Sequence, residues 1–144
     1  MRKIFLLTAL STLFALIGLL GACGSGSNTG TPGKTLATGP AGNNLTATIS
    51  NVEGALRKGR QEFTLTFTDA AGKPVDVGAV ALNNHMAGMG SMSAMNNAAT
   101  FTTTGTPGVY KGQMEVEMAG EWQAQITYEG PAGKGSFALP IDAK

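Results

Sequence analysis

The sequence predicts an all-β protein: an immunoglobulin-like antiparallel β-sandwich of about seven strands, placed after a cleaved lipoprotein signal and a flexible tether. Three observations support this fold class. Several short segments alternate apolar and polar residues with a period of two, turn-forming residues separate them, and no long helical pattern occurs. Short, half-buried strands at regular spacing are typical of sandwiches. A small barrel is the alternative architecture.

The first 22 residues have the order of a bacterial lipoprotein signal peptide. Arg2 and Lys3 form a short positive region, an apolar stretch follows from Ile4 to Leu19, and small residues lead to Cys23. A plain transmembrane anchor is the alternative, because the apolar stretch approaches the ~20 residues that span a membrane. The single cysteine at the cleavage position favours the signal. We therefore expect Cys23 to be lipidated and the mature chain to be an extracytoplasmic, membrane-anchored protein.

Residues 23–43 are interpreted as the lipidated cysteine and a flexible linker rich in Gly, Ser and Thr. Such a segment buries too little apolar surface to offset the entropy of ordering it. Gly24 and Ser25 lack the aspartate that marks inner-membrane retention. This predicts an outer-membrane anchor facing the periplasm if the host is Gram-negative. Residues 44–144 are then one domain of about 100 residues, a size that supports a single core.

Six strands are predicted in the domain, each from the alternation of apolar and polar residues along it. In Phe63–Thr68 the apolar residues alternate with threonines, and in Tyr110–Met118 and Trp122–Tyr128 one face is apolar and the other polar. Trp122 is expected to be buried on an inward face. The full set of predicted strands is Leu45–Val52, Phe63–Thr68, Val75–Leu82, Tyr110–Met118, Trp122–Tyr128 and Gly135–Ile141.

Two details of these strands carry further predictions. The alternation changes phase between Val77 and Val80, which indicates a β-bulge within that strand. Met114 and Met118 share the inward face of their strand and are expected to belong to the core.

Charge excludes one class of partner. Without Arg2 and Lys3 the chain has eight Lys and Arg against nine Asp and Glu, a net charge of about −1. No basic stripe with interleaved aromatic residues is present, so nucleic-acid binding is not expected. The short basic segment Arg57–Arg60 is interpreted as a solvated loop between strands.

The segment from His85 to Met95 carries the side chains with the most distinctive chemistry. It contains four methionines at i+3 spacing beside the only histidine. Thioethers are soft ligands that suit Cu(I), and imidazole also suits copper. We therefore predict a Cu(I) site on the loop after the Val75–Leu82 strand. Its ligands are His85, Met86, Met89 and Met92, with Met95 as a possible extra ligand. The alternative is that these methionines only fill gaps in a core.

Residues 62–128 resemble the YtkA-like domain, which is related to the FixH family. The resemblance is carried by Phe63–Leu65 with Asp69–Val75, by the His-Met-x-x-Met-Gly run, and by Gly108–Gly112 with Met118–Trp122. The family pattern often places proline beside the first methionine, where this chain has Ala87. The resemblance implies an immunoglobulin-like extracytoplasmic domain that handles copper or assists assembly of haem–copper oxidases.

Two functions follow as hypotheses. The first is a membrane-anchored copper-binding protein, a Cu(I) chaperone or buffer, with a copper-receiving membrane protein or oxidase subunit as partner. The second is a non-metal accessory module that docks on a membrane complex. An enzyme is not expected, because the sequence offers one histidine, no free thiol and no recognisable catalytic arrangement.

Overall fold

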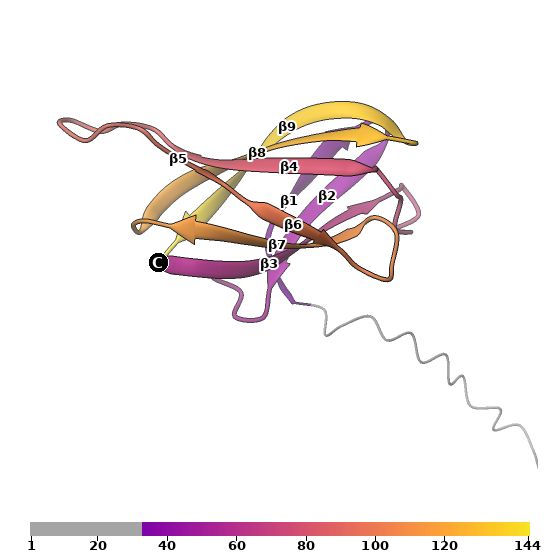
Figure 1. The fold of residues 1–144 in the computed structure, drawn as a ribbon, viewed down its shortest axis with the longest axis horizontal. Coiled ribbons are helices and arrows are strands. Elements are labelled where there is room, and N and C mark those ends of the chain that lie inside the picture. Colours follow the sequence, from indigo (N-terminus) through magenta and orange to yellow (C-terminus); the bar gives the residue numbers. More distant parts are fainter. Residues whose placement is uncertain (1–32) are drawn as a thin grey trace, which may run out of the picture.

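The structure, a computed structural model, describes residues 33–144 and is all-β over that range (Figure 1). The chain forms nine strands in this part of the molecule. They are β1 (Lys34–Gly42), β2 (Leu45–Asn51), β3 (Gly59–Thr68), β4 (Ala79–Met86), β5 (Met95–Ala98), β6 (Thr100–Thr103), β7 (Val109–Val116), β8 (Gly120–Gly130) and β9 (Gly133–Ala143).

The strands form two antiparallel sheets that pack face to face. One sheet has the order β1-β2-β3-β7-β6 and the other β5-β4-β8-β9. The chain changes sheet between β5 and β6 at Ala99, whose backbone N–H donates to the carbonyl oxygen of Leu82 at 2.8 Å. The predicted β-sandwich is confirmed, with nine strands rather than about seven. No helix among residues 33–144 is long and apolar enough to cross a membrane.

The core follows from the alternation along the central strands. Phe63, Leu65 and Phe67 of β3 are buried while the threonines between them face outward. On β8, Trp122 has no exposed surface and pairs directly with Ile141 of β9. The prediction that Trp122 faces inward is therefore confirmed.

Strand β1 corrects the predicted linker. The tether was expected to continue to residue 43, but Lys34–Gly42 pairs with β2 from Lys34↔Asn51 to Gly42↔Leu45. Ala41 is buried, and its carbonyl oxygen accepts a hydrogen bond from the hydroxyl of Tyr128 at 3.1 Å. The expectation was wrong for these residues, because a partner strand supplies the order that their own composition does not. The rest of the predicted signal and linker lies outside the described residues.

The segment Val75–Leu82 also differs from the prediction. The strand begins at Ala79 instead of Val75 and continues to Met86. The predicted β-bulge within this strand is therefore wrong, because Val77 and Gly78 lie before the strand starts. The change of phase between Val77 and Val80 is caused by Gly78, which has a φ of +76° and interrupts the extended chain. The hydroxyl of Tyr110 donates to the Gly78 carbonyl oxygen at 2.9 Å and holds this kink, and burial raises the pKa of that hydroxyl.

Candidate metal site on the β4–β5 hairpin

The predicted ligands lie on and around a β-hairpin made by β4 and β5. Figure 1 shows the connection between these strands projecting past the body of the sandwich. At its tip the backbone N–H of Met89 donates to the Met92 carbonyl oxygen at 3.1 Å, and the N–H of Met92 donates back at 2.9 Å. Gly90 and Ser91 form the two-residue turn between them. Gly90 has a φ of +58°, the conformation that glycine supplies at the first position of a type II′ turn.

Met89 and Met92 directly face each other across this tip. Residues that exchange both backbone hydrogen bonds have Cα atoms about 5.5 Å apart and side chains on the same side of the hairpin. Met89 is 62% exposed and Met92 is 41% exposed. Among the large apolar residues of the described chain, only Val52 is also exposed. The hairpin therefore presents two thioethers to solvent at one point.

Met86 and Met95 have a different environment. They also pair directly across the hairpin, but Met86 is 4% exposed and Met95 packs against the core. The two pairs are three residues apart along each arm, about 10 Å at ~3.3 Å per residue. The two pairs therefore lie at different positions along the hairpin and in different environments, the tip pair exposed to solvent and the other pair packed against the core.

His85 lies on the opposite face of the sheet from Met86. Consecutive residues of a strand point to opposite faces, and His85 is half-buried on the outer face. Both residues belong to β4, so the expectation that they lie in a loop is wrong. The structure divides the five predicted ligands into an exposed tip pair, an inward pair and an outward histidine.

The ring of His85 is oriented by a neighbouring amide. Its Nδ1 lies 2.9 Å from the Oδ1 of Asn96, and the Nδ2 of Asn83 donates to the same oxygen at 3.1 Å. Because an amide oxygen only accepts, Nδ1 carries the proton in the neutral imidazole and Nε2 retains a lone pair. The Nε2 atom is therefore the one that remains for a ligand.

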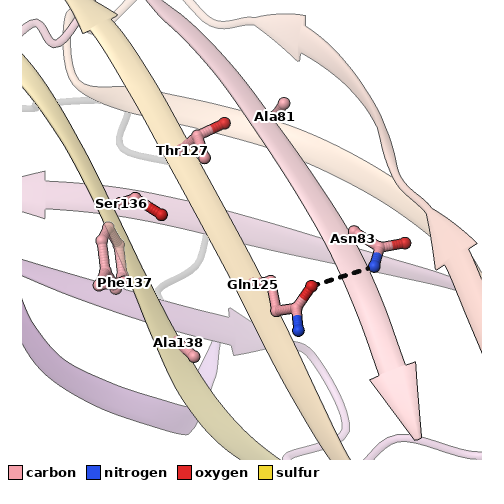
Figure 2. Close-up of a pocket in the computed structure, with 7 residues that line it drawn as sticks. All are labelled: Ala81, Asn83, Gln125, Thr127, Ser136, Phe137 and Ala138. Carbon is pink, nitrogen blue, oxygen red and sulfur yellow. Dashed lines mark hydrogen bonds between the residues drawn. The ribbon is translucent and has the colours of Figure 1, made fainter.

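A shallow hollow of about 400 Å³ lies beside this histidine on the outer face of the four-stranded sheet. Figure 2 shows its neutral lining and the hydrogen bond at 3.2 Å from Asn83 Nδ2 to Gln125 Oε1. The lining residues are Ala81, Asn83, Gln125, Thr127, Ser136, Phe137 and Ala138. None of them is a soft metal ligand, so the hollow is separate from the methionine tip.

Behind the hairpin lies a buried polar residue that the sequence reasoning missed. Asn84 has no exposed surface and points into the core between Leu82 and Met86, and neither of its amide atoms has a hydrogen-bond partner. Its cross-strand neighbour Asn97 also has an unpaired Nδ2 atom. The sequence did indicate the inward position of Asn84, because side chains alternate between faces along a strand and Asn84 is two residues after the inward-facing Leu82.

Replacing Asn84 by leucine should raise the free energy of unfolding by about 1 kcal/mol or more. An unsatisfied buried polar group costs about 1–3 kcal/mol, and leucine has the same branching without polar atoms. Chemical denaturation monitored by circular dichroism measures the change. Asn83→Leu on the outer face is the matched control and should give no gain, because that amide is hydrogen-bonded. A lower stability for Asn84→Leu than for wild type would contradict this account.

Within residues 33–144 no group of three or more His, Cys, Asp or Glu side chains is arranged to hold a metal ion.

The fold and the site together define the class of protein: a small β-sandwich domain that carries its candidate ligands on a projecting hairpin. The chain belongs to the YtkA-like family, whose sequence profile matches residues 41–127. No curated protein and no solved structure matches the chain. The matched range includes β4, β5 and the hairpin tip.

Proposed function

We propose that this protein is a lipid-anchored extracytoplasmic protein that binds Cu(I) through Met89 and Met92. It would act as a chaperone or buffer rather than as an enzyme. The family resemblance suggests that the ion is delivered to a haem–copper oxidase during its assembly. Lipidation at Cys23 would supply the membrane anchor.

The observation that carries the proposal is the exposed pair of thioethers at the hairpin tip. Burying large apolar side chains is favourable, so two exposed methionines on one turn need a reason. Thioethers are soft, neutral ligands that suit Cu(I) and bind Mg²⁺ or Ca²⁺ poorly. Neither sulfur has to lose a proton, so binding would persist at low pH. Two protein ligands also leave other coordination positions open, as transfer to a receiving site requires.

The division of the methionines supplies a matched pair of variants. Met89→Leu with Met92→Leu should lower Cu(I) affinity by more than about 100-fold, beyond the 10–100-fold typical for loss of an outer-shell partner. Met86→Leu with Met95→Leu removes the same number of sulfurs from the inward pair and should leave the affinity within a few-fold. Competition against a colorimetric Cu(I) chelator measures both. Stability should change by less than about 1.5 kcal/mol per site in either variant.

The proposal would be refuted if the protein with Met89→Leu and Met92→Leu bound Cu(I) as tightly as wild type. A loss confined to the inward variant would move the site into the core instead. His85→Ala should weaken Cu(I) binding less than the tip variant does, and should weaken any Cu(II) binding more. Imidazole nitrogen is the stronger ligand for Cu(II).

A non-metal accessory module is the second candidate, and the composition of the hairpin favours it. No Asp, Glu, Lys or Arg occurs between Asp76 and Lys111, a range that contains the whole projecting segment. An uncharged hairpin with pliable methionines at its tip suits insertion into a groove of a membrane complex. Absence of Cu(I) and Ag(I) binding in wild type would favour this function.

A further inference from the structure

The methionines of the described chain differ sharply in exposure. Met86 and Met114 are buried, with 4% and 2% of their surface exposed. Met89 and Met92, which we call the tip pair, are 62% and 41% exposed and do not belong to the core cluster. The other two methionines of residues 33–144 are half-buried and pack against the core: Met95 and Met118. A small solute therefore reaches the tip pair far more readily than the other methionines.

Nothing in the described chain covers the tip pair. Every residue from 87 to 94 is exposed. Figure 1 shows this connection between β4 and β5 projecting past the body of the sandwich. Access to the two thioethers therefore requires no opening of the fold.

The structure of the tip depends on its backbone and not on its sulfur atoms. Met89 and Met92 exchange backbone hydrogen bonds of 3.1 and 2.9 Å, and Gly90 supplies the positive φ of the turn. Adding an oxygen atom to either sulfur of the tip pair therefore breaks no hydrogen bond and disturbs no core packing. The same addition at Met86 or Met114 would bury a polar oxygen, which costs stability unless it is hydrogen-bonded.

We propose that the tip pair is a reversible oxidation site at which a peroxide controls metal binding. The consequence for metal binding rests on the proposed Cu(I) function, whereas the modification does not. A sulfur lone pair attacks one oxygen of hydrogen peroxide, the O–O bond breaks and an S–O bond forms. The sulfur loses two electrons to the peroxide. The second oxygen takes up the proton of the transferred oxygen and leaves as water.

Oxidation and copper compete for the same electrons. Cu(I) binds to a thioether through a sulfur lone pair, and that lone pair is the nucleophile in the oxidation. A sulfoxide presents a polar oxygen, a harder donor that suits Cu(I) poorly. Peroxide therefore closes the empty site, and a bound ion protects it. Methionine sulfoxide reductases, one for each sulfoxide epimer, reverse the change: the oxygen leaves as water while two thiols become a disulfide.

The first test follows oxidation at each methionine. The mature lipidated chain, free of metal and in peroxide-free detergent micelles, is treated with hydrogen peroxide and digested for mass spectrometry. The tip pair should oxidise about ten-fold or more faster than Met86 and Met114, in line with their exposed fractions. The circular dichroism of the sandwich should not change while only the tip pair is oxidised. Similar rates for all four residues, or loss of the β signal as the tip pair oxidises, would overturn the proposal.

The second test measures metal binding before oxidation, after it, and after repair by both reductases. Competition against a colorimetric Cu(I) chelator should show that oxidised wild type loses as much affinity as Met89→Leu with Met92→Leu. Repair should restore the affinity. Met86→Leu with Met95→Leu is the matched control, and it should respond to peroxide as wild type does. Bound Ag(I), which peroxide does not oxidise under these conditions, should protect the tip pair of wild type.

Failure of this inference and failure of the proposed function give different results. If reduced and oxidised wild type bind Cu(I) equally tightly, control by oxidation is overturned and the proposed function stands. If reduced wild type binds neither Cu(I) nor Ag(I), the proposed function is refuted, and control of metal binding with it. The oxidation site is then judged by selectivity and repair alone: selective oxidation of the tip pair that both reductases reverse supports it, and unselective or unrepaired oxidation overturns it.

Discussion

Replacing Trp122 by alanine should lower the free energy of unfolding by about 3–5 kcal/mol, the range for large aromatic side chains in cores. Trp122 is completely buried, and its neighbour on the adjacent strand β9 is Ile141. Its indole Nε1 donates to the Met118 carbonyl oxygen at 3.0 Å. Truncation would therefore leave a cavity between the sheets and remove the partner of that carbonyl group.

Denaturant unfolding followed by far-ultraviolet circular dichroism measures this loss without relying on tryptophan emission. Trp122→Phe retains an aromatic ring but not the N–H, so it should lose less stability than the alanine variant. Gln123→Ala, on the outward face of the same strand, is the surface control and should stay within about 0.5 kcal/mol of wild type. A loss below about 1 kcal/mol for Trp122→Ala would contradict the packing described for this end of the core.

Removing β1 should have a larger effect still. A chain that begins at residue 44 lacks the ladder with β2, and it also lacks the Ala41 carbonyl oxygen that accepts the Tyr128 hydroxyl. It would leave β2 as an unprotected edge strand beside the core. We expect the loss to be comparable to the whole stability of a small domain, about 5–15 kcal/mol, so that the shortened chain is mostly unfolded.

The matched control is a chain that begins at residue 33, which retains every described strand. It should unfold cooperatively with the stability of the mature protein. Circular dichroism and denaturant titration compare the two. A cooperative transition of the shorter chain at the same denaturant midpoint would show that residues 34–42 contribute little, as the sequence had suggested.

The contrast between β1 and β3 shows which strands the sequence predicts and which it does not. Phe63–Thr68 alternates large apolar residues with threonine, so burial of one face is encoded locally and the strand was predicted. Residues 34–42 contain two glycines and a proline and offer only small apolar side chains apart from Leu36. Their order comes from pairing with β2, and such pairing depends on residues that are not adjacent in the sequence.

The same distinction applies to the candidate site. The methionines and the histidine were recognisable from residue type and spacing alone. Their division into the Met89–Met92 tip, the inward Met86 and Met95, and the outward His85 follows from the hairpin register. A shift of one residue would move each side chain to the other face. The glycine turn at the tip, together with pairing to β8, sets that register.

The sequence by itself determined the β class of this protein, the inward position of Trp122 and the soft-ligand character of the methionine segment. Each of these depends on residue chemistry and on local periodicity. Only the tertiary structure decided that β1 belongs to the domain and that two thioethers face each other in solvent. Those features depend on strand pairing between distant segments, because register and sheet order bring together residues whose separation along the chain carries no such information.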